Sequence, residues 1–142
     1  MTHELFNGKE RRAYVRLETS LSVRFKISGQ EMSKIYAATT KNMSHGGLCL
    51  EIHQDKEELL KKVSADDTKL GIDLDTLVPK PGVADSETPE WVDGRVDWLR
   101  KPNRKNPTLL MGLRFEDLTE KARSLIHSYI VDEFVKRYEI CN

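Results

Sequence analysis

Hydrophobic and polar residues alternate along most of the first 115 positions of the chain. In SLSVRFKIS, positions 20–28, every second residue from Leu21 to Ile27 is apolar, and the residues between them are polar or charged. Successive side chains of a strand point to opposite faces, so this period of two predicts a strand with one buried face.

Five further segments repeat the alternation and are predicted to be strands: KIYAATTK (34–41), GLCLEI (47–52), KLGIDLD (69–75), WVDGRVDWL (91–99) and TLLMGLRF (108–115). Ser28-Gly29-Gln30 has the composition of a turn after the first strand. Asp73 and Asp75 share one side of their strand, which we expect to be solvated. Many short strands with one apolar side predict a closed barrel or a sandwich, in which few strand edges are exposed.

The period changes after Phe115, where apolar residues recur every three or four positions. They are Leu118, Ala122, Leu125, Ile126, Tyr129, Ile130, Phe134 and Tyr138. This spacing predicts a helix over about 118–138, with Asp117 as its N-cap and Glu120 as the capping-box partner. We expect its apolar face to pack against the barrel, with a homodimer interface as the alternative. A shorter helix is expected over 55–63.

Two segments have the composition of loops. VPKPGVADSETPE (78–90) is rich in Pro, Gly and acidic residues, which predicts a long solvated loop. RKPNRKNP (100–107) has the turn residues of a hairpin tip and four basic side chains.

The 142 residues fit one domain whose core needs neither disulfides nor metals. No apolar run approaches the roughly 20 residues of a membrane span, and the first ten residues lack the pattern of a signal peptide. The only cysteines are Cys49 and Cys141, so a reducing, cytoplasmic setting is expected. The four histidines lack metal-ligand spacing and neither cysteine has the surroundings of a nucleophile, so we expect no metal and no enzyme.

The formal net charge of zero conceals an uneven distribution of charge. Residues 1–30 hold six Lys and Arg against three Asp and Glu, 51–97 hold six against thirteen, and 98–114 hold five basic residues and no acidic one. A nucleic-acid binder would be more uniformly basic, and aromatic residues at 7% are few for a single-strand groove. Two basic segments suit a small anionic ligand better.

Three arginines gather in ERRAYVRLE, residues 10–18. Arg12 and Arg16 are four positions apart, which points both side chains the same way on a helix or on an extended chain. Guanidinium groups form bidentate bonds with phosphates and with the O6/N7 edge of guanine. The alternative is that these arginines only solvate an N-terminal arm.

A second candidate motif lies in KNMSHGGLCLE, where Asn42, Ser44, Gly46 and Gly47 precede an apolar strand. Asn and Ser side chains can bond to the backbone and hold a tight turn, and glycine lets the backbone approach a ligand closely. An ordinary turn between two strands is the alternative. His45 is expected to be an exposed turn residue.

Together the motifs read Arg12-x-x-x-Arg16 and, about 25 residues later, Asn42-x-Ser44-x-x-Gly47. This pair resembles the two-part signature of PilZ domains. GRVDWL is similar to a later strand of that family, and MGLRFEDL resembles its Gly-x-x-Phe strand (Gly112, Phe115), which leads into a C-terminal helix. The resemblance runs from about Arg11 to Tyr138.

The resemblance implies a six-stranded antiparallel β-barrel with a C-terminal helix over 19–142, preceded by a flexible arm over 1–18. It implies cyclic di-GMP as ligand, a bacterial second messenger with two guanines and two phosphates. By the same resemblance Arg12 and Arg16 close over this ligand, Asn42 and Ser44 bond guanine, and Gly47 leaves room for the strand to approach. Asn42 stands where the family commonly has Asp, and its amide offers a donor and an acceptor.

Two further residues are candidates for the same site. In the family an arginine at the position of Arg11 is associated with binding a self-stacked pair of ligand molecules, and a solvated neighbour is the alternative. Trp98 could stack on a guanine. The alternative for Trp98 is a core position, because it shares a strand face with Val92 and Val96 if the alternation is regular.

The implied function is a cytoplasmic bacterial receptor, without enzymatic activity or cofactor, that orders its arm on binding and signals to a downstream protein partner. Nucleic acid and membrane insertion are not expected. The alternative is a PilZ-type adaptor that binds proteins but no nucleotide. Adaptors of this kind typically lose the arginines or the Asn/Asp-x-Ser motif, and both are present here.

Overall fold

The computed structural model describes residues 16–30, 34–79 and 90–141, the last four by their backbone alone. The described elements are, in order, β1 (Leu17–Glu18), β2 (Ser22–Ile27), β3 (Tyr36–Met43), β4 (Gly47–Ile52), α1 (Lys56–Lys62), β5 (Lys69–Asp73), α2 (Leu74–Leu77), β6 (Trp91–Arg100), β7 (Leu109–Glu116) and α3 (Glu120–Cys141). The six strands expected from the alternation and both expected helices are therefore present, together with β1 and α2.

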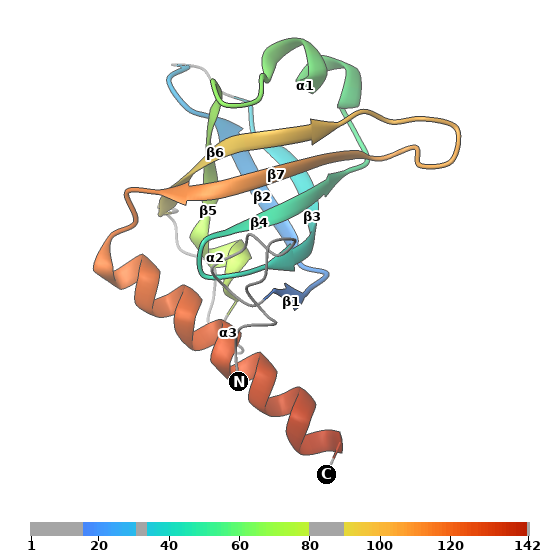
Figure 1. Cartoon of the computed structure of the whole chain (residues 1–142). Coiled ribbons are helices and arrows are strands. Elements are labelled where there is room, and N and C mark those ends of the chain that lie inside the picture. The colour runs from blue at the N-terminus through green and yellow to red at the C-terminus, as the bar shows by residue number, and fades with distance from the viewer. Residues whose placement is uncertain (1–15, 31–33, 80–89, 142) are drawn as a thin grey trace, which may run out of the picture.

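Six of the strands form a closed antiparallel barrel (Figure 1). Their order is β3-β2-β5-β6-β7-β4, and β4 pairs with β3 again to close the barrel. The predicted six-stranded barrel is thus confirmed. Closure leaves no free edge on β5, β6 or β7, because each of them pairs with a neighbour on both sides.

The seventh strand, β1, lies beside β3 just beyond the part of β3 that pairs with β2. Leu17 stands opposite Met43, and Leu17 is almost fully buried. Of the expected arm, residues 1–15 lie outside the described residues, while Leu17 and Glu18 form this strand.

The core is filled by the inward residues of the strands, as the alternation predicts. On β2, Val23, Phe25 and Ile27 are buried, and the Phe25 ring stacks on Tyr36 of β3 with 5.4 Å between ring centroids. Burying a side chain of this size stabilises the fold by about 1.5–3 kcal/mol. The barrel is therefore held together by its interior and can display polar chemistry on its outer face.

The segment KLGIDLD departs from its prediction, because the strand ends at Asp73 and α2 begins at Leu74. Asp73 is completely buried rather than solvated. Its Oδ2 accepts bonds from Nε and Nη2 of Arg24 at 3.1 and 2.8 Å, and its Oδ1 accepts from the backbone N–H of Asp75 at 3.1 Å. Asp73 thus caps α2, which a strand reading of the segment could not reveal.

The long helix α3 covers one end of the barrel, and α1 lies near the other end (Figure 1). Ala122, Ile126 and Ile130 are buried, so the expected packing of the apolar face against the barrel is confirmed. The predicted cap is wrong. Thr119 caps the helix, its Oγ1 accepting from the N–H of Ala122 at 3.0 Å, whereas Asp117 has a left-handed backbone with φ of 52°.

The basic segment after β6 forms the expected hairpin tip between β6 and β7. Oδ1 of Asn103 accepts from the N–H groups of Lys105 and Asn106 at 2.9 and 2.8 Å, which closes the turn.

Most of the predicted loop 78–90 lies outside the described residues, which stop at Pro79 and resume at Glu90. None of the described helices has the length and apolar character to cross a membrane.

Candidate functional site

Four residues from four strands lie in one row across the outer face of the barrel. The register places Asn42 of β3 opposite Cys49 of β4, Cys49 opposite Gly112 of β7, and Gly112 opposite Trp98 of β6. Directly opposite residues project to the same side of a sheet. Residues up to 70 positions apart in sequence therefore meet on one patch of surface.

A β-bulge places Trp98 at one end of this row. Val96 pairs with Leu113 and Trp98 with the next residue, Gly112, so Asp97 is an extra residue on β6. Val96 is fully buried, whereas Trp98 is 42% exposed. The expectation that Trp98 shares a core face with Val96 is wrong, because the extra residue reverses the alternation and turns both Asp97 and Trp98 outward.

A second bulge places Asn42 at the other end of the row. Thr40 pairs with Leu50 and Asn42 with Cys49, so Lys41 is the extra residue on β3. Thr40 points inward, is buried, and its Oγ1 accepts from the N–H of Leu21 at 2.8 Å. A regular strand would direct Asn42 inward as well, and the bulge instead brings its amide to the outer face.

Small residues form the low part of this surface. A side chain on Gly112 would meet the indole of Trp98, since a Cβ there would lie 2.0 Å from Nε1. A Cβ on Gly47 would lie 2.0 Å from the carbonyl oxygen of Leu113. Gly47 is thus required by the backbone of β7, a constraint that the sequence did not reveal. Between these glycines lies Cys49, and burial raises the pKa of its thiol.

The predicted tight turn holds the residues that precede β4. The N–H of Ser44 donates to the carbonyl of Gly47 at 2.8 Å, and the N–H of Gly46 donates to Oγ of Ser44 at 3.2 Å. Gly46 also accepts from the N–H of Phe115 at 2.9 Å, which ties the turn to β7. Ser44 therefore sits at a fixed place beside the row.

These residues surround an open pocket of about 190 Å³. It is lined by Arg16, Asn42, Ser44, Gly46, Gly47, Leu48, Cys49, Asp97, Trp98, Gly112, Leu113 and Arg114. Five of the predicted site residues are among them: Arg16, Asn42, Ser44, Gly47 and Trp98. The other two, Arg11 and Arg12, lie outside the described residues.

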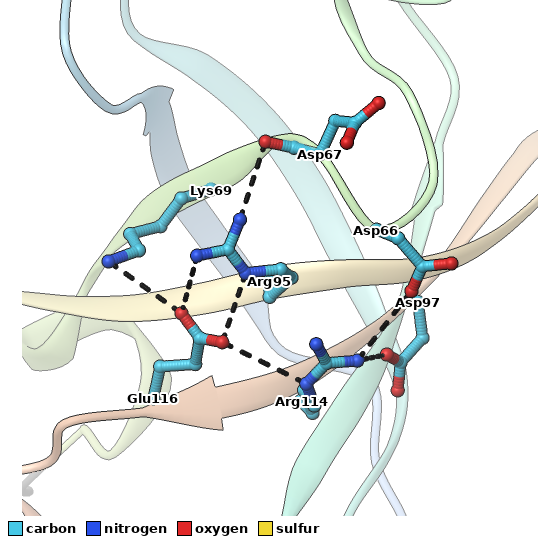
Figure 2. Close-up of polar contacts among 7 residues, drawn as sticks. All are labelled: Asp66, Asp67, Lys69, Arg95, Asp97, Arg114 and Glu116. Carbon is cyan, nitrogen blue, oxygen red and sulfur yellow. Dashed lines mark hydrogen bonds and ion pairs between the residues drawn. The ribbon is translucent and has the colours of Figure 1, made fainter.

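The sequence did not identify Asp97 and Arg114 as residues of this pocket. Both belong to a charged network that runs over β5, β6 and β7 (Figure 2). Nε and Nη2 of Arg95 each donate to Glu116 at 3.0 Å, and Lys69 lies 3.6 Å from the same carboxylate. These bonds lower the pKa of Glu116, the hydrogen bond from Arg95 being the largest cause.

His45 lies in the turn, but it is partly buried rather than exposed. Its Nε2 is 2.7 Å from Nδ1 of His127 on α3, so one ring donates and the other accepts. Burial, and secondly the charge of His127, lower the pKa of His45. Over the described ranges no three His, Cys, Asp or Glu side chains are grouped as a metal would need.

The pocket offers complementary chemistry for a nucleotide. Arg16 supplies an exposed guanidinium, Asn42 an amide, and Trp98 an aromatic face. Guanidinium groups and amides recognise phosphates and base edges, and aromatic faces stack on bases. The site therefore suits an anionic ligand that carries a nucleobase.

Comparison with known proteins identifies the family and the fold of the chain. The family model described as PilZ domain matches residues 10–132 of the chain. Among solved structures, the PilZ domain of Escherichia coli YcgR with c-di-GMP is 12% identical with a TM-score of 0.56, and the match covers 92% of this chain and 97% of that domain. No curated protein sequence matches.

Two longer proteins share the fold. The Klebsiella pneumoniae MrkH–c-di-GMP complex is 16% identical with a TM-score of 0.58, covering 91% of this chain and 55% of MrkH. Bacillus subtilis MotI/DgrA, an inhibitor of motility, is 18% identical with a TM-score of 0.52, covering 89% of this chain and 53% of its own. The chain thus spans about half the length of these two proteins.

Proposed function

Because the chain belongs to the PilZ domain family, we propose that it is a bacterial cytoplasmic receptor for cyclic di-GMP, without enzymatic activity or cofactor. One observation carries the proposal. The predicted binding residues come from three separate stretches of sequence and line one pocket: Arg16, then Asn42, Ser44 and Gly47, and Trp98. YcgR and MrkH, whose folds are similar, have structures with c-di-GMP.

Four of the residues that line the pocket contact the ligand in the proposed complex. Trp98 stacks on one guanine, because its exposed indole is a flat apolar platform beside the small residues of the row. Asn42 and Ser44 bond that guanine from the barrel. Arg16 approaches from the start of β1 and bonds a phosphate or the O6/N7 edge.

The pocket is too small for the whole ligand. Its 190 Å³ falls below the roughly 300–1,000 Å³ of pockets that bury a drug-sized molecule. The rest of the dinucleotide therefore needs a cover, and the arginines before β1 can supply it. Arg12 lies four residues before Arg16, and Arg11 precedes it directly. In the proposed complex Arg12 closes over the ligand, and Arg11 contacts a second, stacked ligand molecule.

Calorimetric titration with cyclic di-GMP, with GTP as the control ligand, tests this proposal. We expect saturable heat with cyclic di-GMP alone, and a stoichiometry of two ligands per chain if Arg11 has the role given above. A folded sample that gives no heat at high micromolar ligand would contradict the receptor. The chain would then be an adaptor that binds proteins without nucleotide.

The proposed output of binding is an ordered N-terminal arm that changes how the barrel meets a protein partner. A segment that folds over a ligand loses conformational entropy and delivers a change of shape. Hydrogen exchange of the amides in residues 1–18 should slow when cyclic di-GMP is added. Identical exchange with and without saturating ligand would rule out the mechanism but leave the receptor intact.

A further inference from the structure

A carboxylate and a guanidinium form one wall of the pocket. Nη1 of Arg114 donates to Oδ1 of Asp97, and the same nitrogen lies 3.8 Å from Asp66 (Figure 2). Nε of Arg114 lies 3.9 Å from Glu116. The side chains of Asp97 and Arg114 are 38% and 46% exposed, so solvent and a ligand can reach both.

The bulge on β6 explains why the carboxylate lies at this place. In a regular strand Asp97 and Trp98 would point to opposite faces, but here both line the pocket. The indole is the stacking platform of the proposed site, and the carboxylate is attached to the preceding residue. A base that stacks on Trp98 therefore brings one of its edges close to Asp97.

Charge balance explains why Asp97 is paired. Cyclic di-GMP carries two negative charges, so an unpaired carboxylate in its pocket would repel it. Arg114 neutralises Asp97, while Glu116 is bound mainly by Arg95 and Lys69. Among the described residues, Oδ2 of Asp97 has no hydrogen-bond partner, so the carboxylate keeps an acceptor for a ligand.

We propose that Asp97 reads the Watson–Crick edge of guanine and that Arg114 is its positioning residue. This inference rests on the proposed function above. Guanine presents N1–H and the N2 amino group side by side, and a carboxylate can accept from both. Adenine presents a lone pair at N1 and no amino group at C2, so the same carboxylate rejects it. Stacking on Trp98 tolerates either base, and selectivity then comes from Asp97.

The test compares cyclic di-GMP with cyclic di-AMP on the full chain, by calorimetry and by competition. The wild-type chain should strongly prefer cyclic di-GMP. Asp97→Asn should weaken cyclic di-GMP binding by about 10- to 100-fold, the scale of one bidentate contact, without weakening cyclic di-AMP. Asp93→Asn is the matched control, because Asp93 is on the same strand, does not line the pocket and should leave both affinities unchanged.

Arg114 provides the second arm of the test. Arg114→Gln should weaken the binding of both dinucleotides, because it leaves the Asp97 charge unpaired, and it should also narrow the preference for guanine, because Asp97 loses the partner that positions it. Arg114→Lys should restore part of both. In the Asp97→Asn background, Arg114→Gln should add little further loss, as expected for residues that act as one unit. Circular dichroism melts of every variant confirm that the barrel is folded.

The outcomes that would contradict these expectations distinguish the receptor function from the role of Asp97. A wild-type chain that binds neither dinucleotide overturns the receptor and this inference together. A wild-type chain that binds cyclic di-GMP, with a folded Asp97→Asn variant of unchanged guanine preference, overturns this inference alone. Additive losses in the double variant would remove Arg114 as the positioning residue.

Discussion

At two positions in the pocket, neighbouring atoms across the sheet leave no room for a side chain larger than that of glycine. Gly112 lies under the indole of Trp98, and Gly47 lies against the carbonyl of Leu113. Neither has a left-handed backbone, since Gly29 is the glycine with positive φ among the described residues. A methyl group on Gly47 would therefore disturb the β4–β7 pairing itself. Lost binding in such a variant would report on packing as well as on ligand contact.

Arg16 offers a cleaner test of ligand contact, because it is exposed and lines the pocket. Arg16→Ala should weaken cyclic di-GMP binding by about 1–3 kcal/mol, the scale of a bidentate contact, measured by calorimetry. Its melting temperature should stay at the wild-type value. Arg123→Ala, which removes an exposed arginine from α3, is the control. A large loss of thermal stability in Arg16→Ala would make this arginine structural.

Asp73 presents the opposite case, a buried charge outside the pocket. Asp73→Ala removes the partner of Arg24 and the cap of α2. We expect a loss of about 2–4 kcal/mol in the free energy of unfolding, measured by urea titration. Asp75→Ala removes a neighbouring, partly exposed carboxylate and should cost far less. Equal effects of the two substitutions would contradict the role of Asp73 as cap and ion-pair partner.

At the scale of elements, sequence periodicity predicted the strands and helix faces in which apolar residues recur at a regular interval. The six barrel strands and the apolar face of α3 follow directly from periods of two and of three to four residues. Periodicity gave the wrong side-chain orientation or the wrong strand end where a single residue interrupts the regular alternation. The bulge at Asp97 reversed the orientation of Trp98, and the side chain of Asp73 ended a strand in favour of a cap.

The candidate site was predictable only as far as its motifs. Residues at motif positions, such as Arg16, Asn42 and Ser44, are candidates from the sequence alone, and the structure brings them to one pocket. Asp97 and Arg114 were missed because they become neighbours only through the register of β6 and β7. Pairing across strands sets that register, and the composition of a single strand does not reveal it.

The contact between His45 and His127 links the turn before β4 to α3, and it predicts a dependence of stability on pH. Burial lowers the pKa of His45 below the value of about 6.5 for a free side chain. Below that pH the unfolded chain binds the proton more readily than the folded chain. The stabilising contribution is therefore complete above about pH 6.5 and is lost as the pH falls through the folded pKa.

Urea unfolding at pH 7.5 and 5.5 measures this effect. Over that interval the wild-type chain should lose more stability than His45→Gln, which cannot gain the proton. His53→Gln, which alters an exposed histidine at the end of β4, should behave as wild type. Parallel losses in wild type and His45→Gln would show that the histidine pair does not respond to pH.

At the scale of the whole molecule, basic and acidic residues are unevenly distributed along the chain. The hairpin tip carries Arg104 and Lys105, which are exposed and have no ion pair within the described chain. Residues 51–97, in contrast, hold an excess of Asp and Glu over Lys and Arg. An anionic ligand therefore meets a directional field although the net charge is zero.

Stopped-flow association with cyclic di-GMP can measure the contribution of the tip. Replacing Arg104 and Lys105 with Gln should slow association severalfold at about 0.01 M salt, where the Debye length is about 30 Å, and hardly at all at about 1 M. Replacing Lys121 and Arg123 on α3 removes the same charge elsewhere and serves as the control. If both pairs slow association equally, net charge rather than the position of the tip sets the rate.

The burial of Leu17 in β1 has a consequence for how the proposed arm works. Leu17 fixes one end of the preceding segment beside β3, and Arg12 is only five residues away. Five residues reach at most about 18 Å, so Arg12 stays at an effective concentration in the millimolar range or above near the pocket. A separate peptide carrying the same arginines would have to be supplied at such concentrations to replace it. The covalent attachment itself, rather than strong individual contacts, would then account for much of the affinity.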